Sequence, residues 1–395
     1  MKKLVVVFVS LMLIQFFACA KTSDTFKPGQ TIKIGFIGPM SGAESDYGKF
    51  PSQAVRLAVD EFNEQGGIHG FKIELVIGDS AGKAEIGVPA VEKLIKTDKI
   101  ICLVGDIFSA VSLAIGPIAE DAKVVMISSS THKDVTNKGK FIFRTIMSDS
   151  TQAIVFAKYL TTVENIKTAA ILYVNTDYSK GLAMDFWGEF EKEGSSVVAL
   201  EVAAPGTQDF KPHLRKILAK QPEILYLPNY ITGIAPVIKQ AKEIGLKAKI
   251  YSADSFSSTQ IFDLVGNLAN GVVFSQMAEV PENPTTQRFI AKYQEKWGED
   301  PALFAVNVYD ATCIILNAIK QKASKNIISG SLNIDRDVLR DFIAETKDFD
   351  GASGKITFTK NGDSVSNVGI FISEDRKFRQ TRVYQLDGSD LVELK

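Results

Sequence analysis

From residue 31 onward, short apolar runs alternate with stretches whose hydrophobic positions have helical spacing. The run at residues 32–37 predicts a buried strand, and Val55, Ala58, Val59 and Phe62 recur at i, i+3, i+4 and i+7 on the helix expected after it. The same alternation continues through strands expected at residues 72–77, 100–104 and 124–127. Strands that alternate with helices predict an α/β fold with a parallel sheet covered on both faces.

A second set of alternating elements follows residue 145. Its strands are expected at residues 169–174, 197–202, 224–227, 249–252 and 272–275. Three further helices are then expected at residues 285–297, 303–321 and 336–346, and the tail after them alternates in a way that predicts antiparallel or edge strands. The pattern therefore predicts two doubly wound units of similar size, joined by several chain crossings.

The first residues have the pattern of an export signal. Lys2 and Lys3 precede an apolar run at residues 4–17 that only Ser10 and Gln15 interrupt. This run is short for a membrane span and is followed by small residues, so we expect it to be removed rather than kept as an anchor.

Two cleavage sites fit the residues that follow. Residues 16–19 resemble a bacterial lipobox, in which Cys19 would be lipidated and become the new N-terminus; Phe16 stands where Leu is usual. Ala18-Cys19-Ala20 also fits an A-x-A site, which would release a soluble protein. We favour the lipoprotein, with a signal at residues 1–19, a tether at residues 20–30 and a periplasmic or other extracytoplasmic location.

Composition limits the partners that we expect. The chain has 395 residues, is 45% hydrophobic and has a net charge of −1, which favours two apolar cores and gives no reason to expect nucleic acid as a partner. Cys102 and Cys313 lie in apolar patterns and are expected to be buried free thiols. No Cys/His cluster has zinc spacing, so we expect no metal and no cofactor.

Polar residues follow several of the expected strands. Ligands bind beyond the carboxyl ends of parallel strands, where we find Ser109, Thr131 and, from the second unit, Asp254. A helix start with a hydroxyl suits a carboxylate, and a carboxylate suits an ammonium group, so these residues predict a clamp for a zwitterion. Each also has a simpler explanation: Ser109 suits an N-cap, and the nearby tyrosines suit packed aromatic positions.

Other functional classes lack their motifs. There is no G-x-G-x-x-G, no P-loop and no G-x-S-x-G elbow, and His132 alone of the three histidines is expected near a cleft. An enzyme is therefore disfavoured. A transcriptional regulator on such a fold would need a DNA-binding headpiece, and the chain has an export signal there.

Several motifs resemble the branched-chain amino-acid binding proteins of ABC transporters. The resemblance rests on residues 34–42, 58–70, 105–109, 143–145 and 177–181, and extends over residues 32–386. It implies the type I periplasmic binding fold, with two doubly wound lobes joined by three hinge crossings. The first lobe would take residues 31–145 and 278–362, and the second would take residues 146–277 and 363–395.

The resemblance also implies roles for individual residues. Ser109 and Thr131 would hold the ligand carboxylate, while Asp254 and a carbonyl at Ser130 would hold the ammonium group. The remaining contacts would come from Tyr47, Phe108, Ser129, Tyr178, Tyr230 and Phe304.

This chain departs from the family pattern in three places. Asp254 replaces the usual Glu. The loop at residues 128–136 is one residue shorter, which leaves Ser129 and Ser130 as alternatives. Ala81 and Phe108 stand near the positions of a disulfide found in some members.

The resulting expectation is a monomeric binding protein that closes on an apolar amino acid and delivers it to a permease. An amide or aromatic carboxylate is the alternative ligand, and a ligand-sensing receptor is the alternative role.

Overall fold

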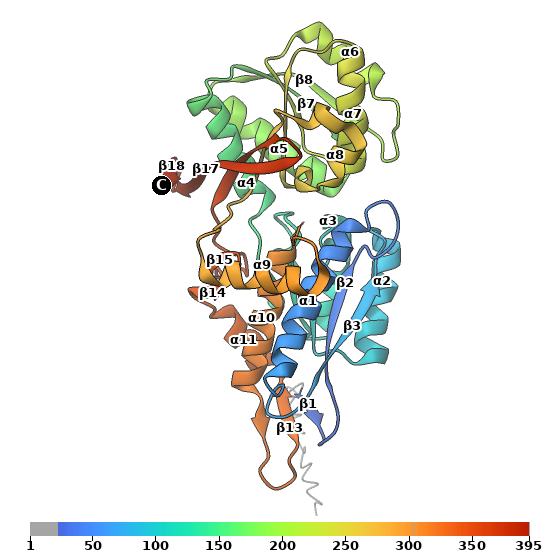
Figure 1. Ribbon diagram of the computed structural model, residues 1–395, viewed down its shortest axis with the longest axis vertical. Helices are drawn as coiled ribbons and strands as arrows, with labels where there is room; N and C mark the ends of the chain where they lie inside the picture. Colours follow the sequence, from blue (N-terminus) through green and yellow to red (C-terminus); the bar gives the residue numbers. More distant parts are fainter. Residues whose placement is uncertain (1–22, 303, 395) are drawn as a thin grey trace, which may run out of the picture.

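The computed structural model describes residues 23–302 and 304–394, which form two lobes stacked along the long axis of the molecule (Figure 1). The expected export signal and Cys19 lie outside the described residues. The tether expected at residues 20–30 is wrong in part, because β1 (Ser23–Phe26) pairs antiparallel with β13 (Leu332–Asp335). Within the described part of the chain, no helix is both long enough and apolar enough to cross a bilayer.

The first lobe is built on a five-stranded parallel sheet in the order β3-β2-β4-β5-β6. Its strands are β2 (Ile32–Gly38), β3 (Ile73–Asp79), β4 (Cys102–Val104), β5 (Val125–Ser128) and β6 (Ile142–Arg144). Its helices are α1 (Asp46–Glu64), α2 (Ala84–Lys93), α3 (Ser109–Asp121), α9 (Pro284–Trp297), α10 (Ala305–Lys322) and α11 (Arg336–Ala344). Apolar side chains of α2 and α3 cover one face of the sheet, and those of α1, α10 and α11 cover the other.

The second lobe contains an eight-stranded mixed sheet in the order β18-β17-β16-β11-β10-β9-β7-β8. Its parallel strands are β7 (Thr168–Val174), β8 (Ser196–Ala203), β9 (Ile224–Leu227), β10 (Lys249–Ser252) and β11 (Val273–Met277). The chain tail adds the antiparallel strands β16 (Val368–Glu374), β17 (Lys377–Asp387) and β18 (Asp390–Leu394). The covering helices are α4 (Asp149–Lys158), α5 (Asp177–Lys192), α6 (Lys211–Lys220), α7 (Ile231–Glu243) and α8 (Gln260–Val265).

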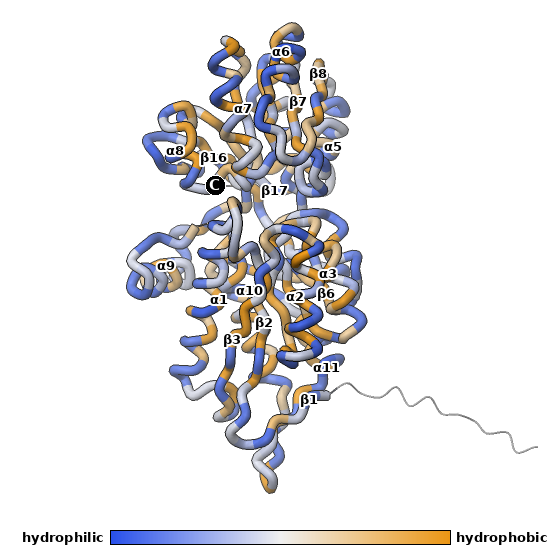
Figure 2. The backbone as a smooth tube through the Cα atoms, turned by 90° about the vertical axis from the view of Figure 1, so that its right-hand side faces the viewer, coloured by the Kyte–Doolittle hydropathy of each residue, from blue (hydrophilic) through white to orange (hydrophobic). Residues whose placement is uncertain are grey.

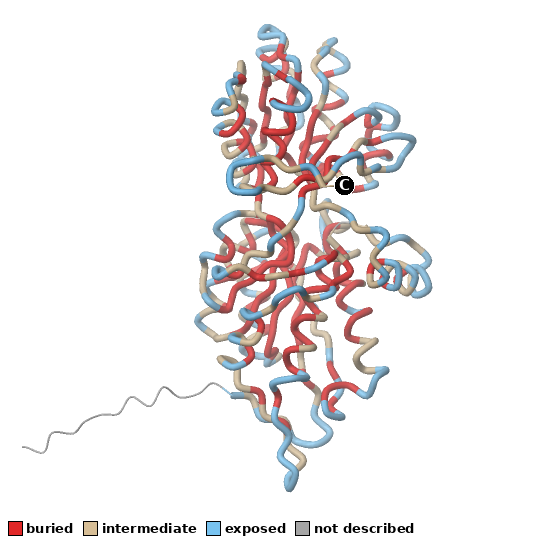
Figure 3. The backbone as a smooth tube through the Cα atoms, turned by 90° about the vertical axis from the view of Figure 1, so that its left-hand side faces the viewer, coloured by how far each residue is buried: buried red, intermediate tan, exposed pale blue. Residues whose placement is uncertain are grey.

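Continuous apolar runs place the central strands in the interior. Every residue of β4 and β9 is buried, because helices cover both faces of each sheet. The burial pattern shows one buried interior in each lobe, and the hydropathy pattern places apolar residues along the same strands (Figures 2 and 3).

The chain crosses between the lobes three times, as the fold class predicted. The crossings lie between β6 and α4, between β11 and α9, and between β15 (Gly354–Ile356) and β16. Side chains tie the first crossing to its neighbours: Thr145 Oγ1 donates to the carbonyl of Asn307 at 2.9 Å, and Ser364 Oγ donates to that of Ile146 at 3.0 Å.

Candidate functional site

A small cavity lies between the lobes, where the carboxyl ends of the two parallel sheets face each other. Most of the residues expected at the site line it, together with two that were not expected, Ile107 and Ser255. Its lining residues are Tyr47, Ile107, Ser129, Thr131, Tyr178, Tyr230, Asp254, Ser255 and Phe304. Phe108 stacks on Tyr230 of this set, while Ser109 and Ser130 lie behind the lining residues and contact each other.

Helix α3 directs its first turn at the cavity. The expectation that Ser109 caps this helix is wrong, because the helix begins at Ser109 itself and Phe108 occupies the N-cap position. The Ser109 hydroxyl is therefore available to other groups and accepts a hydrogen bond from Ser130 Oγ at 3.2 Å. The backbone of Ser109 lies near the hydroxyl of Tyr230, which comes from the opposite lobe.

The loop after β5 turns its serine side chains in different directions. Ser128 Oγ points inward, donating to the carbonyl of Asp106 at 2.9 Å and accepting from the backbone N–H of Ser130 at 3.0 Å. Ser129 lines the cavity, and its buried hydroxyl has no hydrogen-bond partner within residues 23–302 and 304–394. This geometry places the Ser129 and Thr131 side chains at the cavity and the Ser130 hydroxyl against Ser109.

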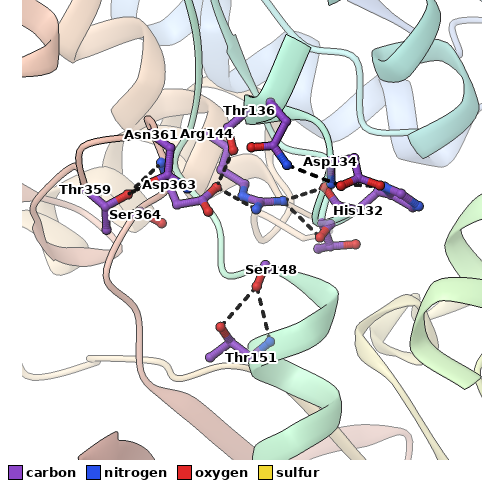
Figure 4. Close-up of polar contacts among 12 residues, drawn as sticks. His132, Asp134, Thr136, Arg144, Ser148, Thr151, Thr359, Asn361, Asp363 and Ser364 are labelled. Atoms are coloured by element: carbon purple, nitrogen blue, oxygen red, sulfur yellow. Dashed lines mark hydrogen bonds and ion pairs between the residues drawn. The ribbon is translucent and has the colours of Figure 1, made fainter. Parts of the chain in front are cut away.

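A buried arginine fixes this loop from below (Figure 4). Arg144 Nη1 donates to the carbonyls of Thr131 at 3.0 Å and His132 at 2.8 Å, and Nη2 pairs with Asp363 at 2.5 Å. A planar guanidinium holds several acceptors in a fixed arrangement, so Arg144 keeps Thr131 in place from outside the cavity. In the same view, the Ser148 hydroxyl accepts from the backbone N–H of Thr151 at 3.2 Å and caps α4.

Asp254 brings a carboxylate to the cavity from the second lobe. It opens a short 3₁₀ turn directly after β10 and is 2% exposed. The hydroxyl of Tyr178 donates to Asp254 Oδ1 at 2.8 Å. Burial raises the pKa of Asp254 to about 6, and this hydrogen bond from Tyr178 offsets only part of the rise.

Asp149 is a second buried acid at the site, and the sequence analysis missed it. It is the first residue of α4 and is 1% exposed, and its N–H donates to the carbonyl of Thr131 at 2.6 Å. Neither carboxylate oxygen has a hydrogen-bond partner in the described residues. Burial raises the pKa of Asp149 well above its usual range; the nearby Thr131 side chain offsets part of this rise, and the charge of Asp254 adds to it. Two acids that each lack full compensation favour a cation between them.

Aromatic rings from both lobes pack around the same cavity. Phe108 stacks on Tyr230 with centroids 4.4 Å apart, and Tyr178 stacks on the other side at 4.7 Å. Tyr47 meets Phe108 edge-on at 5.6 Å and lies 6.3 Å from Phe304. With the rings in these positions the cavity measures about 10 Å³, which is room for one water molecule.

Phe304 has an unusual backbone. Its φ of 59° lies in the left-handed region, where a residue with a Cβ atom is strained. It directly precedes the first turn of α10, and this backbone conformation sets the direction in which its ring approaches the cavity.

Side-chain contacts also join the two lobes across the cleft. Tyr47 Oη donates to the carbonyl of Ser255 at 3.0 Å, and Thr232 Oγ1 donates to Glu44 Oε1 at 2.6 Å. On the far side, Lys133 Nζ pairs with Asp185 at 2.9 Å. Among the described residues, no group of three or more His, Cys, Asp and Glu side chains is arranged to hold a metal ion.

Most of the two-lobed region matches one protein family. The family model for periplasmic binding proteins matches residues 31–374. The Leu/Ile/Val-binding protein BraC3 of Rhizobium johnstonii is 28% identical over 340 residues, covering 85% of this chain and 89% of that protein. A leucine-, isoleucine-, valine-, threonine- and alanine-binding protein of Pseudomonas aeruginosa is 27% identical, over 74% of this chain and 78% of that protein.

Solved structures give the same result. The leucine-binding protein LivK of Thermotoga maritima has a TM-score of 0.81 at 28% identity and covers 89% of this chain and 98% of its own. LivJ of Streptococcus pneumoniae is a branched-chain amino acid transporter substrate-binding protein solved with isoleucine. It has a TM-score of 0.81 at 26% identity, and the match covers 92% of this chain and 100% of LivJ. The chain belongs to the periplasmic binding protein family and has its type I fold.

Proposed function

We propose that this chain is the substrate-binding protein of an ABC transporter and captures an apolar α-amino acid between its lobes. Its matched relatives are amino-acid binding proteins, and two of the matched structures carry the names of leucine-binding and branched-chain amino acid transport proteins. The single observation that carries the proposal is that a buried acid, Asp254, and the hydroxyl groups of Ser129 and Thr131 line one cavity between the lobes.

The acids suit the ammonium group of an amino acid. Asp254 and Asp149 are both buried, and the negative charge of Asp254 adds to the rise in the pKa of Asp149. A cation placed between them would offset the repulsion and the cost of burial together. Asp149 would thus join Asp254 and the carbonyl of Ser130, which the sequence analysis proposed for this role.

The donors suit the carboxylate. Ser109 begins α3, so its N–H and hydroxyl lie at a helix N-terminus, where backbone donors favour an anion. Ser129 and Thr131 add hydroxyls at the cavity wall. Tyr47, Tyr178 and Tyr230 would then enclose the ligand, with Ser130 behind Ser109 and the rings of Phe108 and Phe304 completing the apolar wall.

Capture would proceed by hinge closure at the three crossings. The first lobe, for which we keep the limits 31–145 and 278–362, would bind the carboxylate while the cleft is open. The second lobe would then add Asp149, Asp254 and its two tyrosines. A ligand drives closure only to the extent that it binds the closed form more tightly, and these contacts exist only in that form.

No chemical step is part of the proposal. His132 is the histidine nearest the cleft, and its Nδ1 accepts from the backbone N–H of Asp134 at 3.2 Å. That arrangement does not place a base beside a nucleophile. We further propose that the protein is exported, is held at the membrane through Cys19, acts as a monomer and hands its ligand to a permease.

A ligand panel tests the proposal. Ligand-stripped protein would be screened by thermal shift against amino acids, their amides and aromatic acids, with calorimetry on each hit. A ligand at 100 times its dissociation constant adds about 2.7 kcal/mol to the free energy of unfolding. We expect apolar amino acids to raise the melting temperature and their amides to do so less. A panel in which no amino acid binds would contradict the proposal.

A further inference from the structure

A second, larger cavity adjoins the first. It measures about 300 Å³, which is within the usual range for small-molecule sites. It lies beside the second crossing, between the end of β11, helix α9 and the start of α10. Six of its lining residues are Met277, Ala278, Val280, Ile290, Ala302 and Ala305. We call this cavity the side chamber.

The two cavities share two walls, Asp254 and Phe304. Asp254 is held by its hydrogen bond from Tyr178. Phe304 packs against the apolar cores of the molecule, and its ring lies 6.3 Å from that of Tyr47. The Phe304 ring is therefore a single side chain that separates the two cavities.

The opposite wall of the small cavity is closed by tightly packed rings. Tyr230 lies between Phe108 at 4.4 Å and Tyr178 at 4.7 Å. A ligand side chain directed that way would have to separate both stacked pairs. A side chain directed toward Phe304 meets one ring and then the space of the side chamber.

We infer that the side chamber receives the side chain of the bound amino acid, past Phe304, and that this selects long unbranched or aromatic side chains over short ones. The inference rests on the proposed function, since it takes the ammonium group to lie at Asp254. Asp254 touches both cavities, so an amino acid held there has its Cα next to the boundary.

A homologous series of ligands measures the depth of the chamber. Calorimetry would compare alanine, norvaline, norleucine, 2-aminoheptanoate and phenylalanine on the full-length protein. Each methylene buried in apolar surroundings should tighten binding about fourfold, so affinity should rise through 2-aminoheptanoate. Alanine should not be the tightest-binding ligand of the series.

Two filling variants test the location. Ala278→Leu and Ile290→Trp place extra bulk in the side chamber from two different segments, the residue just after β11 and helix α9. Each should weaken binding of 2-aminoheptanoate by about tenfold or more and leave alanine within about twofold. Ala248→Leu is the matched control: Ala248 is a half-buried alanine of the second lobe that does not line either cavity, so this variant should keep the full series. Melting temperatures of all variants report whether they are folded.

The outcomes separate the inference from the proposed function. If amino acids bind but affinity is flat or falls with length, or if both folded filling variants bind 2-aminoheptanoate like the parent, the side chamber has no such role and the function stands. If no amino acid binds at all, both the function and the inference are wrong.

Discussion

The hydroxyl of Tyr47 in the first lobe donates a hydrogen bond to the carbonyl of Ser255 in the second lobe, at 3.0 Å. Both residues are buried. Tyr47 belongs to α1, and Ser255 lies in the 3₁₀ turn that carries Asp254, so this bond connects the position of the proposed ammonium site to the degree of closure.

Tyr47→Phe should shift the protein toward the open form. The ring and its packing remain, while one interlobe hydrogen bond worth about 1 kcal/mol is lost, so ligand affinity should fall about fivefold. Calorimetry measures the affinity, and small-angle scattering of the ligand-free protein measures the opening. Tyr293→Phe is the control, because the Tyr293 hydroxyl donates to Gln53 within the first lobe; it should lower the melting temperature without changing affinity. Equal affinities for Tyr47→Phe and the parent would contradict the role of this bond.

Asp149→Asn and Asp254→Asn should each weaken amino-acid binding by about 2–5 kcal/mol, because each leaves the ammonium group with one carboxylate instead of two. Calorimetry with the tightest amino acid checks both. Asp24→Asn is a suitable control: Asp24 pairs with Arg336 in the first lobe, and neither residue lines either cavity. If Asp149→Asn bound the amino acid as tightly as the parent protein, Asp149 would not be a ligand of the ammonium group.

Ser109→Ala should reduce affinity for amino acids more than affinity for their amides, since the Ser109 hydroxyl is proposed to face the carboxylate. We expect a loss of about tenfold for the acid. Ser112→Ala, one helical turn further along α3, removes a hydroxyl that donates to the carbonyl of Asp106 and lies behind the cavity wall. It should affect the two ligand classes equally. The same result for Ser109→Ala would show that its hydroxyl does not distinguish the acid.

Ligand affinity should depend on the protonation of Asp254. Its pKa is about 6 in the folded protein, so it is neutral below that pH and cannot pair with an ammonium group. Affinity should therefore fall as pH decreases below 6, by up to tenfold per pH unit. Calorimetry between pH 5 and 8 measures this, with Asp254→Asn expected to lose the pH dependence along with most of the binding. A flat profile in the parent protein would contradict the assignment.

The stability of the ligand-free protein should show the opposite trend. The carboxyl of Asp254 has a higher pKa when folded than its usual 3.8, so the folded state holds the proton more tightly. This group stabilises the fold below pH 4, and that contribution, about 3 kcal/mol, is lost as pH rises through 6. Chemical denaturation of Asp254→Asn should therefore show a smaller decrease between pH 4 and 6 than the parent. Identical decreases would mean that Asp254 does not titrate in this range.

Residues of the candidate site could be predicted from the sequence where they directly follow a strand that the apolar pattern predicts. Thr131 and Asp254 follow apolar runs whose carboxyl ends must lie at the cleft edge of a parallel sheet, and both line the cavity. Ser255 could have been found by the same reasoning, since it follows Asp254 in the same turn. The order of strands and helices predicted both lobes for the same physical reason.

The sequence analysis did not identify Asp149 as a site residue, because its local sequence has an ordinary explanation. It follows a capping serine at the start of α4, where an acid commonly complements the helix dipole. Only the crossing between β6 and α4, which is a tertiary feature, turns it toward Asp254. The cap expected at Ser109 failed because helix ends vary by a residue, and one residue changes the direction of a side chain. β1 escaped because it is polar and pairs with residues 332–335, about three hundred positions away.

The three crossings also determine when the molecule can become compact during its synthesis. The apolar core of the first lobe contains residues of β2 near the start of the chain and Ile356 and Phe358 near its end. The whole second lobe up to β11 is made between these two groups. Contacts so distant in sequence form slowly, and this core cannot be completed until residue 358 has been made. The second lobe has its five parallel strands by residue 277, so the two lobes of one chain differ in the length of polypeptide that each needs before its core is complete.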